Sequence, residues 1–146
     1  MSRRFTLEEA ESLLPEVERS LREALEQRRR YDEAEESIQS VARRVTMAGG
    51  SFVDRGAIMD DRARRDSSAE RLKGAIEEIL TLGVLIKDLD IGLIDFPTLF
   101  RGEEVYLCWK FGERGIRFWH GIEEGFRGRK AIDRDFLDNH EGERLH

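Results

Sequence analysis

The chain is poor in the residues that mark several protein classes. Its 146 residues include one cysteine, two prolines and no long apolar run. A single cysteine cannot form an internal disulfide, so the fold does not depend on an oxidising compartment. No apolar run approaches the ~18 residues that suggest a membrane-spanning helix, and the start of the chain reaches Glu8 and Glu9 without the apolar stretch of a signal peptide. These absences predict a cytoplasmic protein with no membrane partner.

The charge balance also narrows the possible functions. The net charge is −6, the isoelectric point is near 5.2 and 38% of the residues are charged, against about 25% in an average protein. Nucleic-acid-binding domains are usually basic, so nucleic acid is an unlikely partner. Arginine clusters at 28–30, 43–44 and 62–65 are interleaved with acidic residues, as expected for solvated helix faces with ion pairs one turn apart.

The first half of the chain has the pattern of two helices. Thr6 and Glu9 have the spacing of a capping box, and apolar residues then recur at helical intervals, close to a heptad seam. Pro15 either kinks this helix or starts a second one. We predict an antiparallel helical hairpin over 6–47 and 60–82, broken at 48–51 and ended by Gly83. The segment 55–66 at the loop end is expected to be exposed. The seam comprises Val17, Leu21, Ile38, Val41 and Val45.

The second half has the pattern of short strands. Candidates are 84–87, 92–96 (stopped by Pro97), 104–111 and 116–121, with a turn at 112–115. The fold class expected is α+β: a long antiparallel helical hairpin followed by a small, mostly antiparallel β-sheet. We expect one domain over 1–132, with its strand region at 84–121, and a polar, frayed tail over 133–146.

The hairpin turn sets which side chains share a face. A turn centred on Glu113 and Arg114 pairs Leu107 with His120 and Trp109 with Phe118. Side chains alternate along a strand, so Cys108 and His120 would lie on opposite faces, which disfavours a nucleophile–base pair. The predicted core face is Val105, Leu107, Trp109, Phe111, Ile116, Phe118, His120 and Ile122; the half-exposed face is Tyr106, Cys108, Lys110, Arg117 and Trp119.

The polar residues of the strand region are the candidates for chemistry. His120 is either a ligand or general base near a cleft, or a core histidine bonded to backbone. Candidate catalytic carboxylates are Asp88, Asp95 and Glu113, although acids such as Asp88 and Asp90 also cap turns. Lys87 and Arg129 are candidate ligand-binding cations. Arg129 lies in a glycine-rich segment that could form an anion nest or an ordinary turn. The sequence shows no metal-ligand spacing motif and no phosphate loop, so we expect neither a metal site nor a cofactor.

The chain resembles an uncharacterised bacterial family, domain of unknown function 2203. The resemblance is carried by segments 5–10, 13–15, 87–89, 95–97 and 105–109, together with Gly112-Glu113, Trp119-His120 and Gly128-Arg129. It covers nearly the whole chain. The resemblance implies one coherent domain, and it brings no activity, cofactor or catalytic residue.

Two classes of function remain open from the sequence. The first is an interaction or scaffold domain that self-associates, or binds another protein, through its long helices. The second is a small-ligand or metal-dependent enzyme with its site in the strand region. The seam of the first helix favours the first class, and the concentration of polar residues at 87–129 favours the second.

Overall fold

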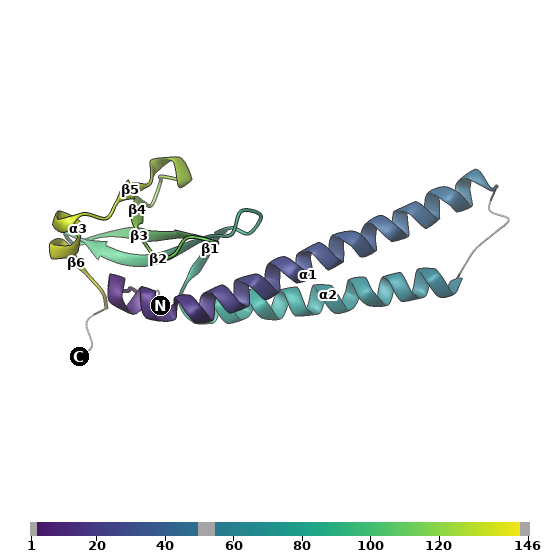
Figure 1. Cartoon of the computed structure of the whole chain (residues 1–146), viewed down its shortest axis with the longest axis horizontal. Coiled ribbons are helices and arrows are strands. Elements are labelled where there is room, and N and C mark those ends of the chain that lie inside the picture. The colour runs from purple at the N-terminus through teal and green to yellow at the C-terminus, as the bar shows by residue number, and fades with distance from the viewer. Residues whose placement is uncertain (1–2, 50–54, 144–146) are drawn as a thin grey trace. The chain divides into compact units, whose positions relative to one another are not determined.

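The computed structural model describes residues 3–49 and 55–143 (Figure 1). By their contacts they divide into two compact units, which lie within Met1–Leu21 plus Glu77–His146 (the sheet unit) and within Arg22–Ile76 (the hairpin unit). The elements in chain order are α1 Leu7–Met47, α2 Arg55–Thr81, β1 Leu85–Asp88, β2 Leu93–Phe100, β3 Glu103–Lys110, β4 Phe118–Gly121, the 3-10 turn η1 Phe126–Gly128, β5 Lys130–Ala131, α3 Arg134–Asn139 and β6 His140–Glu141. The predicted α+β class, with a helix pair followed by an antiparallel sheet, is confirmed.

Helix α1 begins at the predicted capping box. The amide of Glu9 donates to Thr6 Oγ1 at 3.1 Å, and Glu9 Oε1 accepts from the amide of Thr6 at 3.2 Å. Pro15 lies inside a single continuous helix, so it does not start a second one. The break occurs where expected, because α1 ends at Met47 and Gly49 has a φ of 67°; residues 50 and 51 of the predicted break lie outside the described residues.

Helix α2 begins at Arg55, earlier than the predicted 60. The expectation that the segment 55–66 is exposed is confirmed for most of its residues, and Asp61 is the buried exception. Asp61, in this segment, is only 3% exposed because the Ser37 hydroxyl donates to it at 2.6 Å and Arg64 pairs with it. The other end is as predicted: Gly83 has a φ of 89°, which favours glycine, and its amide donates to the Leu80 carbonyl at 3.0 Å.

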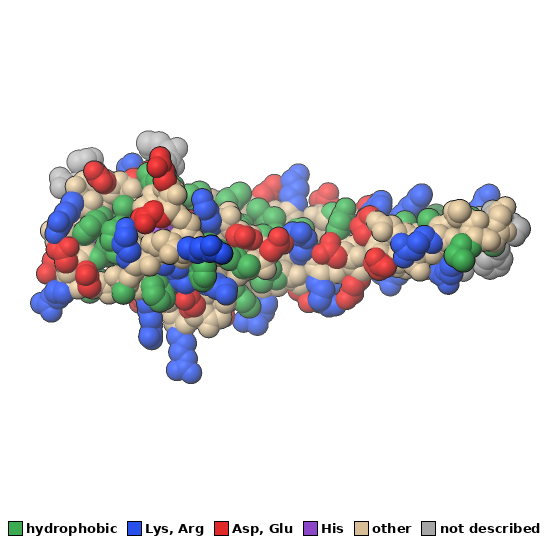
Figure 2. All heavy atoms as spheres, turned by 90° about the horizontal axis from the view of Figure 1, so that it is seen from above, with side chains coloured by type: hydrophobic (Ala, Val, Ile, Leu, Met, Phe, Trp, Pro, Cys, Tyr) green, Lys and Arg blue, Asp and Glu red, His purple; other side chains and the backbone are tan. Residues whose placement is uncertain are grey.

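The hairpin unit has a core of small and polar side chains. Its buried residues are Ala24, Gln27, Ala34, Val41, Asp61, Ser68 and Ala75. Lysine and arginine alternate with aspartate and glutamate over its helices (Figure 2), as the sequence predicted. Arg65 reaches Glu35 on the facing helix at 2.9 Å, whereas Arg29 pairs with Glu26 and Glu33 on its own helix.

The sheet runs in the order β1-β2-β3-β4-β5, every pair antiparallel, with β6 also on β2. Strand β2 continues through Pro97 to Phe100, so the predicted stop at Pro97 was wrong. On that edge of β2, β1 pairs only as far as Asp95 and β6 begins at Leu99. Pro97 lies in the gap between them, where its missing N–H breaks no ladder bond and its carbonyl accepts from the amide of Phe5 at 2.7 Å.

The predicted register of β3 and β4 was wrong by one residue. Tyr106 pairs with His120 and Cys108 with Phe118, so Trp109 and Phe118 are not opposed. The cause is the turn: the amide of Glu113 donates to the Lys110 carbonyl at 2.9 Å, Gly112 has a φ of 99°, and β4 begins only at Phe118. A slip of one residue moves every side chain of β4 to the other face.

The apolar core of the sheet unit lies on the face that holds Trp109. On β2 and β3 this face carries Ile94, Phe96, Leu107 and Trp109, all buried. The ring of Phe5 meets that of Phe96 edge to face at 5.7 Å, and the early part of α1 buries Ala10, Val17 and Leu21. His120 was predicted on this face and belongs to the other one.

Residues 133–143 are folded, so the expected frayed tail was wrong for this part. Asp133 caps α3 by accepting from the amide of Phe136 at 2.8 Å, and Phe136 is buried. Its ring lies 5.0 Å from those of both Phe100 and Trp119. This apolar anchor and the pairing of β6 with β2 hold the polar segment on the sheet unit.

Candidate functional site

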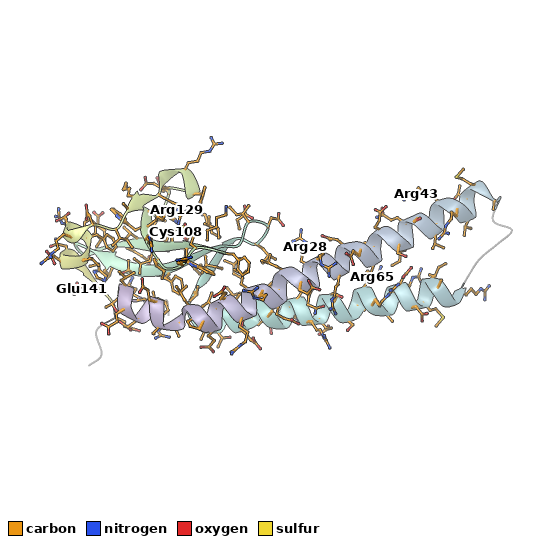
Figure 3. All side chains as sticks on the ribbon, viewed as in Figure 1. Arg28, Arg43, Arg65, Cys108, Arg129 and Glu141 are labelled. Atoms are coloured by element: carbon orange, nitrogen blue, oxygen red, sulfur yellow. The ribbon has the colours of Figure 1, made fainter. Side chains whose placement is uncertain are left out.

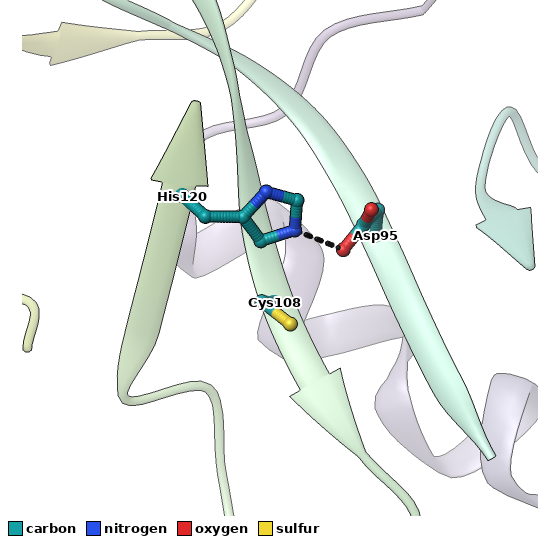
Figure 4. A group of neighbouring side chains, drawn as sticks. All are labelled: Asp95, Cys108 and His120. Carbon is teal, nitrogen blue, oxygen red and sulfur yellow. Dashed lines mark hydrogen bonds and ion pairs between the residues drawn. The ribbon is translucent and has the colours of Figure 1, made fainter. Parts of the chain in front are cut away.

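Three side chains that can bind metal meet on the face of the sheet opposite to Trp109 (Figure 4). Asp95 comes from β2, Cys108 from β3 and His120 from β4. Asp95 is paired with Cys108, and Cys108 with Phe118, two residues before His120. Because paired residues and residues two apart share a face, the sheet itself brings the three together. We call them the Asp–Cys–His cluster.

The cluster is closed to solvent and hydrogen-bonded. His120 and Cys108 are 0% exposed and Asp95 is 1% exposed. The Nε2 atom of His120 lies 2.8 Å from Asp95 Oδ1, and Nδ1 lies 2.8 Å from the Gly121 carbonyl. That carbonyl can only accept, so Nδ1 carries a hydrogen. The bond to Asp95 then holds one further proton, on either the imidazole or the carboxyl group.

The environment changes the acidity of two cluster members. Burial, aided by the negative charge of Asp95, raises the pKa of the Cys108 thiol to about 12. For His120, burial by itself lowers the pKa, but the bonds to Asp95 and to the Gly121 carbonyl outweigh it, so the pKa is raised from its usual 6.5. The metal-free cluster therefore keeps a protonated thiol and favours a histidinium.

This geometry does not suit a thiol nucleophile. Cys108 and His120 share a face, contrary to the prediction, yet both ring nitrogens of His120 are engaged by Asp95 and Gly121. A nucleophilic cysteine needs a base within reach and a lowered pKa. In this arrangement His120 is not free to act as that base, and the pKa of Cys108 is raised instead of lowered.

Arg129 and Glu113 form a second polar group beside Cys108. Arg129 Nη2 donates to Glu113 Oε1 at 2.7 Å and lies 3.4 Å from the Cys108 carbonyl (Figure 3). The guanidinium is stacked on Phe118, 4.0 Å from the ring centroid, and is 10% exposed. Glu113 also accepts from the amide of Lys110 at 2.6 Å, while its carbonyl accepts from Trp109 Nε1 at 2.9 Å. Through these bonds, the Arg129–Glu113 pair holds the β3–β4 connection beside Cys108.

The remaining predicted candidates lie outside the cluster. Asp88 accepts from the amide of Asp90 at 2.9 Å, so it caps a turn, the alternative given for it above. Lys87 is exposed, and its charge opposes protonation of His120. The glycine-rich segment contains its own anion: Glu124 Oε1 accepts from the amide of Gly121 and from Lys130 Nζ, each at 2.8 Å.

The cluster could hold a metal ion, which sequence analysis did not predict. One ligand atom from each side chain lies within 4.8 Å of the others. The spacing 95, 108, 120 matches no local motif, because the ligands come from three neighbouring strands. The information lay in the strand registers: pairing Tyr106 with His120 places Cys108 and His120 on one face, and pairing Asp95 with Cys108 adds the third residue.

Fold and site together define an α+β protein with a helical hairpin and an antiparallel sheet that carries a buried Asp–Cys–His cluster. The chain belongs to the family described as Uncharacterized conserved protein (DUF2203), whose model matches residues 3–132. No curated protein and no solved structure matches it. Among the described residues, no helix is both long enough and apolar enough to cross a membrane.

Proposed function

We propose that this protein binds a thiophilic divalent cation, with Zn²⁺ as the best fit, through Asp95, Cys108 and His120. The observation that carries the proposal is the convergence of three fully buried ligand atoms within 4.8 Å of one another. Sulfur, imidazole nitrogen and carboxylate oxygen are all zinc ligands, at about 2.0–2.3 Å from the metal. A thiolate in the set disfavours Mg²⁺ and Ca²⁺, which prefer oxygen ligands.

The histidine is already oriented as a ligand. Metal-bound histidines usually donate their second ring N–H to a carboxylate or backbone carbonyl. Here Nδ1 donates to the Gly121 carbonyl, so Nε2 is the atom that faces Asp95 and would face the metal. The cation would replace the proton between His120 and Asp95 and the proton of the thiol. One thiolate and one carboxylate would then balance the charge of a dication.

Three protein ligands leave one tetrahedral position for a water molecule or a substrate atom. Catalytic zinc sites have this composition, whereas structural sites usually have four protein ligands. Because the cluster is closed to solvent, metal-assisted chemistry on a substrate would require this part of the sheet unit to open. The candidates Glu113, on the β3–β4 connection, and Arg129, between η1 and β5, would orient the strand that carries Cys108 and would not bind the metal.

The test is zinc binding to protein stripped with a chelator, followed by competition with a chromophoric chelator. We expect one ion per chain with a dissociation constant below about 1 μM. Cys108→Ser, Asp95→Asn and His120→Gln should each weaken binding by at least tenfold, and Co²⁺ should give a thiolate charge-transfer band that Cys108→Ser abolishes. Asp88→Asn, which changes an exposed carboxylate of β1 that lies outside the cluster, is the matched control. Binding that no cluster variant weakens would refute the proposal, as would the absence of stoichiometric binding.

A second candidate function is self-association through the helices. Its support lies in the hairpin unit, where Ile38 and Val45 are only half buried and Met47 and Met59 are 88% and 68% exposed. The early part of the predicted seam does not contribute, because Val17 and Leu21 are buried in the sheet unit. Size exclusion with light scattering at micromolar concentration should give a dimer or larger species, which Met59→Ser with Val45→Ser should dissociate. A monomer throughout would exclude this function.

A further inference from the structure

The segment 133–143, which lies beyond the residues that match the family, is docked on the sheet unit by few and specific contacts. Strand β6 pairs with β2 through Leu99–Glu141 and Phe100–His140. Phe136 fills an aromatic slot, with ring centroids 5.0 Å from Phe100 and from Trp119. The segment thus covers a strand edge and an apolar surface that other residues of the chain form.

His140 joins this segment to the start of α1. Its Nε2 accepts from the backbone amide of Leu7 at 3.0 Å, and its Nδ1 lies 2.9 Å from the Leu137 carbonyl. Leu7 is the first residue of α1, so its N–H is one of the donors that a helix start leaves unpaired. The ring is also stacked on Phe136, with centroids 5.3 Å apart.

These two bonds require one form of the imidazole. The Leu137 carbonyl accepts, so Nδ1 carries the hydrogen; the Leu7 amide donates, so Nε2 must offer a lone pair. A histidinium has no lone pair. Protonation would place a second hydrogen against the Leu7 N–H and a positive charge at the positive end of the α1 dipole.

We propose that His140 is an acid-sensitive latch: its protonation releases residues 133–143 and exposes the β2 edge and the Phe100–Trp119 slot to a peptide of similar kind, an extended strand preceded by an aromatic anchor. Adding a strand to an exposed sheet edge is a common mode of peptide recognition. The occupant seen here, the chain's own segment, defines that ligand class.

Charged residues on the elements around His140 and in the segments next to them set the pH range of the test. They are Arg4 before α1, Glu8 and Glu9 in its first turn, Glu104 of β3, Arg101 between β2 and β3, Asp133 before α3, Arg134, Asp135 and Asp138 of α3, Glu141 of β6 and Glu143. Carboxylates gain protons mainly below pH 5, whereas histidine changes charge between pH 5 and 8. A comparison of pH 7.5 with pH 5.5 therefore reports mainly on the histidines.

The experiment is hydrogen exchange of the full chain, read by mass spectrometry over residues 133–143 and corrected for the intrinsic rate. Protection should fall about tenfold from pH 7.5 to pH 5.5, the combined size of a lost cap and an opposed helix dipole. His140→Gln, whose amide oxygen can still accept from Leu7, should keep its protection at both pH values. An equal loss in His140→Gln, or no loss in the wild type, would overturn the latch.

Two further measurements keep the test decisive. In Gly142→Ala the new methyl group would lie 2.9 Å from the Thr6 amide nitrogen, so the segment should be unprotected at both pH values; this control shows that the assay detects release. If residues 133–143 do not dock in His140→Gln, nuclear magnetic resonance of the wild type alone tests the latch. The ring protons of His140 and the amides of 140–142 must then titrate with one midpoint, and separate midpoints would refute the proposal.

Discussion

Replacing His120 by leucine tests whether the cluster is an electrostatic unit. The substitution removes the partner of Asp95, whose carboxyl group is 1% exposed and bonded to His120 Nε2 at 2.8 Å. Breaking a buried pair by removing one member costs about 3–5 kcal/mol, because it leaves an uncompensated buried charge. Asp95 and His120 are both buried, so solvent does not screen the charge left on Asp95. The full cost of about 3–5 kcal/mol is therefore expected.

The double variant Asp95→Asn/His120→Leu separates charge from packing. It removes the buried charge that the single variant strands, so it should be more stable than His120→Leu alone despite carrying one more change. Urea unfolding of the metal-free protein, with chelator present, gives the free energies. A cost below about 1 kcal/mol for His120→Leu, or a double variant less stable than the single one, would refute the reasoning.

The single variant His120→Leu also tests the direction in which the free energy of unfolding changes with pH. The pKa of His120 is raised in the folded protein, so its contribution to the free energy of unfolding is complete below the unfolded value near 6.5. That contribution is lost as pH rises through the folded pKa. Metal-free wild type should therefore lose stability as the pH rises above about 6.5, by an amount that His120→Leu does not show. Parallel pH profiles would contradict the assignment.

Three further predictions concern single side chains. Trp109→Ala should lower the free energy of unfolding by about 3–5 kcal/mol in urea titrations, because it empties a buried site and strands the Glu113 carbonyl; an unchanged midpoint would show that the core is elsewhere. Native metal-free protein at pH 8 should react with iodoacetamide at Cys108 only as fast as it opens, since the pKa of this buried thiol is about 12, and fast labelling without denaturant would speak against the closed cluster. Thr6→Ala should cost about 1 kcal/mol by thermal unfolding through loss of its bond to Glu9.

The sequence predicted well those features that depend on local physics. The capping box of Thr6 and Glu9 and the helix end at Gly83 each involve residues within one turn, so spacing and residue type suffice. The buried side chains of Val105, Leu107 and Trp109 followed from alternation in a strand, which holds whatever lies opposite.

The features that sequence analysis missed depend on distant partners. Pro97 was expected to stop a strand, yet it lies where two short strands leave a gap on the β2 edge. The tail was expected to fray, yet Phe136 is docked by rings from β2 and β4. The error with most consequence was the turn, where Glu113 caps Lys110 and shifts the register. That single residue of slip separated His120 from Cys108 and concealed the cluster.

The docking of Phe5 on Phe96 and of Leu7 on His140 has a consequence for biosynthesis. These contacts join residues 91 and 133 positions apart in the chain, and the hairpin unit lies between them in sequence. During synthesis, the apolar side chains of residues 5–21 stay exposed until the ribosome has made nearly all of the strands that cover them. Non-local closure of this kind slows folding and leaves apolar surface open to aggregation meanwhile. The nascent sheet unit is therefore the part of this protein that we expect to depend on chaperones.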